Sequence, residues 1–311
     1  MTGIKTCERK IRRTPRATIF GIIALALLIL ALLYSESLKE WALSGLRLAG
    51  LSVIPSVFPF MIMSDILVSL GIPGQSFFGR IIKKVLGLSP RLALAVLCGN
   101  ICGFPIGVKI AAEEYRLGAI SKEELEGALG VLNNPSLAFV ISVVGLGIWG
   151  SIKAGAMLYL SVVIATLIVG YLFKSRDKKC EFSGYNTRQS FSLSESIKTS
   201  GFASIGIASY MTFFSALTGL ASGIIKNRTI TVLFATLSEV GLATSLLSCG
   251  VFSERVSFAL TALALGFSGM SVHMQAKMLL PKEISMRKYY LMKALEGGLA
   301  FGISFIFFVL F

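Results

Sequence analysis

Of the 311 residues, 54% are hydrophobic and only 15% are charged. A soluble domain carries roughly 25% charged residues, so this composition excludes an ordinary soluble enzyme or binding domain and predicts an integral membrane protein. The net charge of +14 would suggest nucleic-acid binding in a soluble chain. Here the basic residues lie mostly in short connections between apolar stretches, so the lipid bilayer is the expected partner and nucleic acid is not.

The N-terminal part carries the first orientation signal. Residues 1–16 form a basic tail, and residues 17–40 contain a first transmembrane span and its connection to the next segment. The pattern is similar to a signal peptide, but the apolar core is long and no small-residue cleavage site follows it, so an uncleaved span is expected. Two more basic clusters lie within residues 80–91 and 174–188, and the positive-inside rule predicts that all three are cytoplasmic.

Apolar segments then follow one another to the end of the chain. Because about 20 apolar residues cross a bilayer, we expect roughly seven to ten membrane-embedded segments, some of them re-entrant. These segments lie within residues 48–79, 92–108, 127–152, 154–173, 199–225, 229–253, 256–276 and 297–311. Two of them carry one acidic residue each, Asp65 and Glu239.

Three stretches contain residues that interrupt a helix. They are Pro55–Phe60, with two prolines four residues apart, the Gly-Phe-Pro-Ile-Gly sequence at 103–107, and Asn133-Asn134-Pro135. Proline lacks an N–H and clashes with the preceding turn. Broken backbone at membrane depth must be buried in protein or line a wet cavity, and many carriers build substrate sites there. A kinked helix whose Lys109 reaches back to the interface is an equally open interpretation.

The second half of the chain repeats the pattern of the first. Residues 266–269 form another glycine-rich break, and His273 follows it as Lys109 follows the first, at an offset of 164 residues (273 − 109). Two weakly similar halves are typical of transporters. The expected fold is all-α, polytopic and transporter-like. The two pseudo-repeats and the cytoplasmic linker between them are expected at residues 41–173, 197–311 and 174–196.

Polar groups at membrane depth are functional candidates because burying them is unfavourable. The candidates are Asp65, Asn100, Lys109, Asn133, Asn134, Glu239 and His273. Asp65 and Glu239 could couple ion movement or pair internally with a lysine or with backbone N–H groups, and the internal pair is slightly favoured for Asp65. Asn133 and Asn134 could bind a substrate carboxylate or only the carbonyls that the broken helix frees.

An intramembrane hydrolase is disfavoured. Residues 266–269 read Gly-Phe-Ser-Gly, which is similar to the nucleophile motif of rhomboid proteases. That chemistry needs a histidine within hydrogen-bond reach of Ser268. The single histidine, His273, follows five residues later, about 140° around a helix axis and so on another face. No catalytic residue, cofactor or metal site is expected, and Cys98 and Cys102 are expected to be packing residues.

Four stretches together resemble a known family. They are Pro55-x-x-Phe58-Pro59-Phe60, Gly103-Phe104-Pro105-x-Gly107-x-Lys109, Asn133-Asn134 and Gly266-Phe267-x-Gly269-x-Ser271-Val272-His273. The chain from residue 41 onward resembles the sporulation integral membrane proteins of the YlbJ/SpoVV type, in the nucleoside-recognition Gate domain superfamily. The resemblance implies a polytopic carrier that moves dipicolinic acid across the outer forespore membrane. Cys102, Phe104 and Val108 replace the serine, tyrosine and alanine of the family's central motif, which leaves the substrate open.

The residues and the resemblance together predict a carrier for a small organic anion, with dipicolinate as the expected substrate. The expected substrate-binding residues are Gly103, Pro105, Gly107, Lys109, Asn133, Asn134, Glu239, Ser268, Ser271 and His273. Lys109 and His273 are expected to flank one site, and Lys109 to pair with Glu113, Glu114 or Glu239 when the site is empty. The alternatives are a nucleoside or other small-metabolite transporter and a non-transporting sporulation scaffold. Assembly into a homo-oligomer is left open.

Overall fold

The computed structural model describes residues 15–69, 77–174 and 191–310, and every regular element in these ranges is a helix. In chain order the α-helices are α1 (Pro15–Leu33), α2 (Ser35–Leu48), α3 (Ile54–Ser69), α4 (Phe77–Leu86), α5 (Ala93–Ile101), α6 (Ile106–Arg116), α7 (Lys122–Leu132), α8 (Ile152–Leu172), α9 (Leu193–Ile225), α10 (Arg228–Ser238), α11 (Val240–Leu247), α12 (Glu254–Phe267), α13 (Gly269–Leu279) and α14 (Arg287–Phe307). Two π-helices, Ala49–Val53 and Phe139–Ile148, and two short 3₁₀ turns, Pro90–Leu92 and Phe308–Leu310, complete the described chain.

Five helical segments among the described residues are long and apolar enough to cross a bilayer, so the chain is a multi-pass membrane protein. They are Ser35–Ser69, Ile152–Leu172, Leu193–Ile225, Glu254–Leu279 and Arg287–Phe307. Shorter apolar helices lie between them, as expected for segments that enter the membrane part without crossing it alone. The predicted all-α polytopic class is confirmed, whereas the two pseudo-repeats remain a prediction.

The prediction of a break at Pro55–Phe60 is wrong. Residues 35–69 form one continuous helix in which the π-helix Ala49–Val53 joins α2 to α3. Pro55 lies in the first turn of α3 and Pro59 lies inside it. The N–H of Ile54 bonds to the carbonyl of Ala49, five residues back. The π turn ends two residues before Pro55, and the helix continues past both prolines.

The other predicted breaks are confirmed. The chain leaves the helix between α5 and α6 at Gly103, whose φ of 89° is a conformation that glycine adopts readily. It leaves the helix again at residues 133–136, after α7. Ser268 adopts a left-handed conformation between α12 and α13. A further break at Glu239, between α10 and α11, was not predicted.

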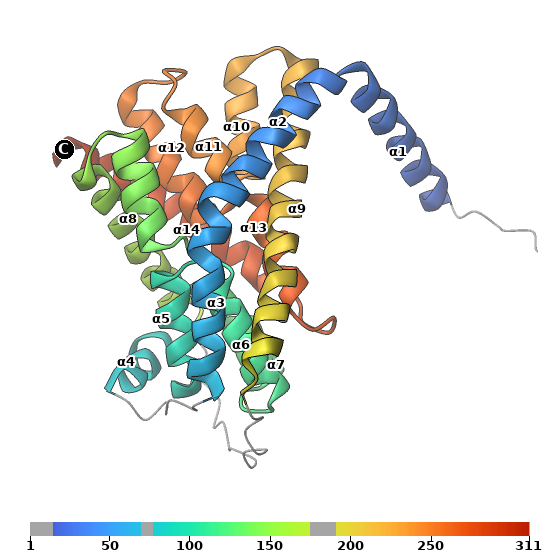
Figure 1. Cartoon of the computed structure of the whole chain (residues 1–311). Coiled ribbons are helices and arrows are strands. Elements are labelled where there is room, and N and C mark those ends of the chain that lie inside the picture. Colours follow the sequence, from blue (N-terminus) through green and yellow to red (C-terminus); the bar gives the residue numbers. More distant parts are fainter. Residues whose placement is uncertain (1–14, 70–76, 175–190, 311) are drawn as a thin grey trace, which may run out of the picture.

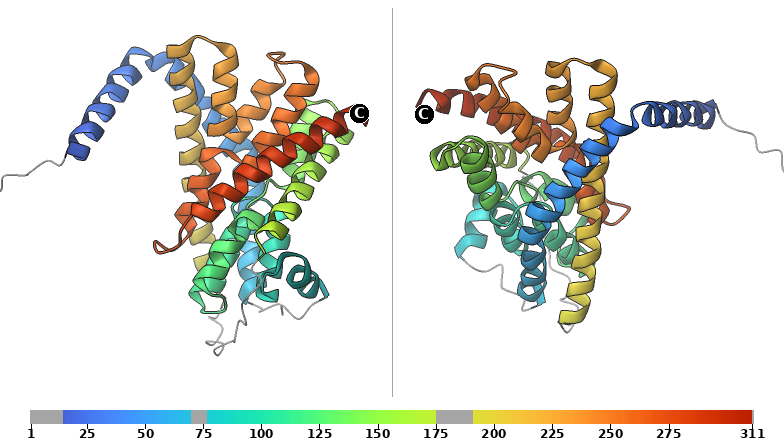
Figure 2. Two further views of the ribbon diagram at one scale, coloured as in Figure 1. Left: turned by 180° about the vertical axis from the view of Figure 1, so that it is seen from behind. Right: turned by 45° about the horizontal axis from the view of Figure 1, so that its top comes forward.

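The long helices run through much of the height of the molecule, and the shorter helices lie beside and between them (Figure 1). The continuous helix α2–α3 lies beside α9 through most of the height of the molecule, and α14 packs against α8 and α12. Seen from behind, α14 runs obliquely across this bundle (Figure 2). Helix α1 projects away from the rest, and its large apolar side chains are exposed, as expected for a helix that lipid surrounds.

One end of the molecule collects basic residues. The ammonium group of Lys174 donates a hydrogen bond to the carbonyl of Lys84, which ties the end of α8 to α4 (2.5 Å). Both lie at the lower end in Figure 1, together with the end of α3 and the start of α9. Lys174, the described residue of the third basic cluster, therefore lies against the second cluster. The basic tail and most of residues 174–188 lie outside the described residues, and the cytoplasmic placement stays a prediction.

Candidate functional site

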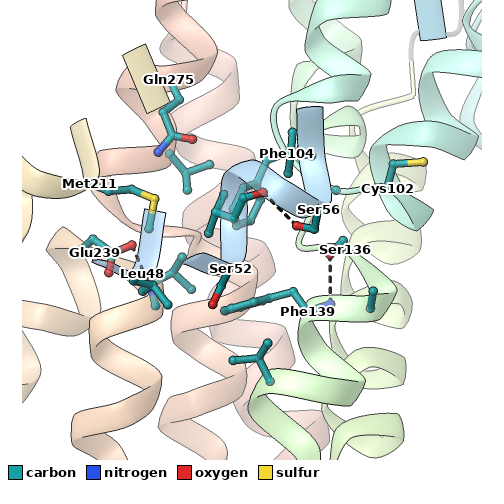
Figure 3. Close-up of a pocket in the computed structure, with 18 of the residues that line it drawn as sticks. Leu48, Ser52, Ser56, Cys102, Phe104, Ser136, Phe139, Met211, Glu239 and Gln275 are labelled. Carbon is teal, nitrogen blue, oxygen red and sulfur yellow. Dashed lines mark hydrogen bonds between the residues drawn. The ribbon is translucent and has the colours of Figure 1, made fainter. Parts of the chain in front are cut away.

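A cavity of about 290 Å³ lies where the helix breaks converge (Figure 3). Its wall comes from the π turn before α3, from the α5–α6 break, from the start of the π-helix Phe139–Ile148, from α9, from Glu239–Gly241 and from α13. Broken backbone in a membrane protein is tolerated where it lines a cavity, and this arrangement follows that rule. The volume suits a molecule of one or two rings.

The cavity wall is apolar with hydroxyl and amide groups set into it. Phe104 and Phe139 supply aromatic surface, and the side chains of Met211, Val143 and Leu48 supply aliphatic surface. The polar side chains on the wall are Ser52, Ser56, Ser136, Ser142, Gln275 and Glu239. Among the described residues that line the cavity, none is a lysine, an arginine or a histidine.

Gly103 and Phe104 join two breaks into one wall. The N–H of Phe104 donates to the carbonyl of Asn134 across 2.7 Å. A Cβ atom on Gly103 would lie 2.5 Å from the backbone nitrogen of Ser136, so only glycine allows this approach. Gly107 allows close helix packing, because a side chain there would overlap the carbonyl of Leu132 where α6 packs on α7. Of these predicted site residues, Gly103 lines the cavity and Gly107 is a packing residue behind it.

Glu239 lies on the cavity wall and caps the helix that follows it. Its carboxylate accepts hydrogen bonds from the N–H groups of Gly241 (3.1 Å) and Leu242 (2.6 Å) at the start of α11. The side chain is 1% exposed. This arrangement is one of the alternatives left open for Glu239, the pairing with backbone N–H groups, and the favourable helix N-terminus accounts for a carboxylate in this buried position.

Lys109 pairs with Asp65, and not with the three glutamates that the sequence suggested. Its ammonium group lies 2.7 and 2.8 Å from the two carboxylate oxygens. It also donates to the hydroxyl of Ser200 (3.2 Å), while Ser196 donates to Asp65 (2.5 Å). The predicted internal pair for Asp65 is confirmed. Glu113 instead pairs with Arg116 on the surface, and Lys109 does not line the cavity.

A second ion pair lies deep in the protein, behind the cavity. The Lys293 ammonium group lies 3.0 Å from the carboxylate of Glu296, one turn further along α14, and both side chains are closed to solvent. Lys293 also donates to Oδ1 of Asn134 (2.9 Å), and Thr166 on α8 donates to Glu296 (2.7 Å). Asn134 in turn donates to Oδ1 of Asn100 (2.9 Å). The predicted residue Asn134 therefore connects the break to a buried charge pair.

His273 belongs to the same buried region. Its Nδ1 atom lies 2.8 Å from the hydroxyl of Tyr289, which also accepts a hydrogen bond from Nδ2 of Asn133 (2.7 Å). The imidazole ring is fully buried and contacts the edges of Phe267 and Tyr290. Asn133 and His273 are thus brought together through Tyr289. Neither lines the cavity, and Lys109 and His273 do not face one another across it.

Three other predicted site residues also lie behind the wall. Pro105 is buried at the start of α6. Ser268 donates to the carbonyl of Leu265 (3.2 Å), with no histidine contact. Ser271 accepts a hydrogen bond from Gln275, which lines the cavity (3.2 Å).

Among the described residues, no cluster of three or more His, Cys, Asp or Glu side chains could hold a metal ion.

Sequence reasoning missed the residues of α14. Tyr289, Lys293 and Glu296 precede the charge-free run that begins at Gly297, so they read as a polar connection and not as part of a span. Their spacing was the available signal, because positions 289, 293 and 296 fall on one helix face. Thr166 gave no signal of its own within the apolar α8.

Comparison with known proteins gives one distant relationship. No protein-family model matches the chain, and no solved structure matches it. The chain is 26% identical over 146 residues to the sporulation integral membrane protein YlbJ of Bacillus subtilis (strain 168). The match covers 46% of this chain and 35% of that protein, about a third of the relative's length. The chain is therefore a multi-pass membrane protein distantly related to a sporulation membrane protein.

Proposed function

We propose that this protein is a membrane carrier whose substrate, a small organic anion, binds in the cavity where the helix breaks meet. The observation that carries the proposal is the convergence of broken helices from both halves of the chain on one cavity of about 290 Å³. A packing defect would not need hydroxyl groups on its wall, whereas a carrier site needs a few polar groups that fix the orientation of its substrate.

Dipicolinate is the substrate that we propose. Its flat pyridine ring suits the space between Phe104 and Phe139, and its carboxylates suit the hydroxyl groups of Ser52 and Ser142. The distant relationship to a sporulation membrane protein supports a role in sporulation. The resemblance to proteins that move dipicolinic acid supports the outer forespore membrane as the place of action.

One feature of the cavity favours a second candidate. Glu239 places a carboxylate on the wall, and the described lining residues include no cation. A neutral aromatic molecule with hydrogen-bonding edges, such as a nucleoside, would not be repelled by this carboxylate, whereas a dianion needs positive charge from elsewhere. A nucleoside or another neutral small metabolite is therefore the alternative substrate class.

Uptake into proteoliposomes that contain only this protein tests both candidates. Labelled dipicolinate and labelled uridine would be compared with empty liposomes, and we expect dipicolinate to enter. Val143→Trp fills the cavity and should abolish uptake. Leu146→Trp is the matched control on the same π-helix, because Leu146 is 54% exposed on the outer surface.

Uptake of uridine alone would select the alternative substrate. Normal uptake by Val143→Trp would show that the substrate does not pass through this cavity. The absence of any uptake above that of empty liposomes would contradict the carrier function for both substrates.

A further inference from the structure

The buried face of α14 carries a chain of polar groups that the proposed substrate site does not use. Tyr289, Lys293 and Glu296 are each 0% exposed and follow one another along this face. Their partners come from four other places, namely Asn133 and Asn134 at the break after α7, Thr166 on α8, His273 on α13 and, through Asn134, Asn100 on α5. We call these eight residues the α14 network.

The α14 network holds three buried polar atoms that have no hydrogen-bond partner. They are Oδ1 of Asn133, Nε2 of His273 and Oε2 of Glu296. A buried polar group without a partner is unfavourable, and such groups in a native protein call for a functional reason. Their concentration in one network of connected side chains makes the network a candidate for binding a further ligand.

His273 and Tyr289 share one hydrogen bond, and the direction of that bond depends on the tautomer of the ring. Of the three unpartnered atoms, Oε2 of Glu296 is the one that belongs to a group with a formal negative charge.

A proton is the ligand that this position accepts. A metal ion at Oε2 would lie next to the Lys293 ammonium group, which is already 3.0 Å from the same carboxylate, and the two cations would repel each other. A proton needs no cavity and converts the carboxylate into a neutral carboxylic acid. No other bond is made or broken, and the proton comes from water and returns to it.

The network is linked directly to the cavity wall. Lys293 donates to the side chain of Asn134, and the carbonyl of Asn134 accepts from the N–H of Phe104, which lines the cavity. When Glu296 is ionised, it neutralises Lys293. When Glu296 is protonated, the positive charge of Lys293 is left unbalanced behind the wall, where the described lining residues offer an anion no cation.

We propose that Glu296 is a proton-binding site that couples substrate movement to proton movement, with Lys293 as the charge that protonation exposes to the substrate. This proposal rests on the carrier function. Substrate and proton would bind together on one side and leave together on the other, because each favours the binding of the other through a shared charge.

The helices around the Lys293–Glu296 pair carry other titratable or charged groups. His273 on α13 and Tyr289 and Tyr290 on α14 belong to the network or contact it. The remaining groups on α7, α8, α12, α13 and α14 are Lys122, Glu123, Glu124, Glu126, Lys153, Tyr159, Tyr171, Glu254, Arg255, Lys277, Arg287 and Lys288.

A measurement that needs no substrate tests the proton site. Infrared difference spectra of the purified protein between alkaline and acidic buffer should contain the C=O stretching band of a buried carboxylic acid. We expect Glu296→Gln to remove this band and Glu239→Gln to leave it. Glu195→Gln is the exposed control, because Glu195 forms an i,i+3 pair with Lys198 on the protein surface. A band that Glu296→Gln leaves unchanged would overturn the proposal.

Proteoliposomes test the coupling. At zero membrane potential, held by equal potassium on both sides and an ionophore, a pH difference of one unit should drive about tenfold accumulation of dipicolinate by the wild type if one proton accompanies each substrate. The potential must be held because a dianion that moves with one proton carries a net negative charge. We expect the double variant Lys293→Met, Glu296→Gln to lose the accumulation, because it lacks both the proton site and the charge that attracts the substrate. The exposed pair Glu195→Gln, Lys198→Met is the matched control and should accumulate as the wild type does.

Two outcomes of this second experiment would contradict the proposal. One is pH-driven accumulation at the wild-type level by the double variant, and the other is wild-type accumulation that follows a sodium gradient and not a pH gradient. If no dipicolinate or uridine moves at all, the carrier function fails, and the infrared band still decides whether Glu296 binds a proton.

Discussion

Two ion pairs in the interior of the described part of the protein are built differently. Lys109 and Asp65 come from different helices, 44 positions apart in the chain, and their side chains are 15% and 27% exposed. Lys293 and Glu296 lie one turn apart on α14 and are 0% and 1% exposed. Partial exposure lets water replace a lost partner, so the first pair can open at modest cost. The second pair has no water to replace either charge.

The two pairs also differ in how completely their charged atoms are hydrogen-bonded. The ammonium group of Lys109 contacts both Asp65 oxygens, the hydroxyl of Ser200 and the carbonyl of Met61. Its pair is well satisfied and fastens α6 to α3 and α9. The deep pair leaves one carboxylate oxygen of Glu296 without a partner. The Lys109–Asp65 pair is thus built like a structural contact between helices. The Lys293–Glu296 pair is built like a site that can change its charge.

The largest expected effect comes from removing one charge of the deep pair. Lys293→Met leaves Glu296 without its cation in a dry interior and should destabilise the protein by about 3–5 kcal/mol. Thermal unfolding in detergent measures this loss. The double variant Lys293→Met, Glu296→Gln should recover most of it, because no net charge is then buried. A double variant no more stable than the single one would show that the charges themselves do not matter.

Removing one hydroxyl of the network should have the next largest effect. Tyr289→Phe keeps the ring but leaves Nδ2 of Asn133 and Nδ1 of His273 without a partner, so we expect a loss of about 1–3 kcal/mol in the same unfolding assay. The control is Tyr290→Phe, since Tyr290 is 38% exposed and its hydroxyl can bond to water. Equal losses in the two variants would contradict a special role for Tyr289.

The partly exposed pair should be less sensitive. Asp65→Asn keeps the shape of the side chain and removes its charge, and water can reach the lysine, so a loss of about 1–2 kcal/mol is expected. A water-soluble amine reagent should also modify Lys109 faster in this variant. If Asp65→Asn is as damaging as Lys293→Met, the difference in exposure does not govern the energetics of the two pairs.

The smallest effect should come from Ser196→Ala. Ser196 donates to Asp65, but Lys109 keeps the carboxylate paired when the hydroxyl is gone, so we expect about 0.5–1.5 kcal/mol. The surface variant Ser209→Ala is the control, because its hydroxyl bonds only to the carbonyl of Ile205 in its own helix. A larger loss for Ser196→Ala than for Asp65→Asn would place the stabilising contact on the serine.

The sequence predicts the breaks best where the backbone chemistry is local. Glycine at 103 and the Asn-Asn-Pro run at 133–135 each interrupt a helix whatever surrounds them, and both breaks are present. Pro55 and Pro59 gave an equally strong signal and failed, because Pro55 lies in the first turn of α3 after a π turn, and the helix continues past Pro59. The break at Glu239 carries no proline, and only its role as the cap of α11 explains it.

The site residues were harder to predict because distant contacts decide them. Polar residues at membrane depth were found, but the particular side chains that pair with them were not. Asp65 rather than a glutamate reaches Lys109, since α3 and α6 pack together, and Asn134 turns away from the cavity toward Lys293. The cavity serines went unnoticed, because a single hydroxyl in an apolar run is common and only the fold shows which of them share one wall.

The length of the α2–α3 helix has a consequence for the surrounding lipid. Its 35 residues span about 52 Å, and the 33 residues of α9 span about 50 Å, whereas the hydrocarbon layer is about 30 Å thick. Tilting takes up only part of this mismatch, so the ends of both helices extend to the headgroup level. Asp65 and Ser196 lie within a turn or so of those ends. The thickness of the membrane therefore determines how far water reaches the Lys109–Asp65 pair. A thicker bilayer would place the pair closer to the hydrocarbon layer and strengthen the contact between α3, α6 and α9.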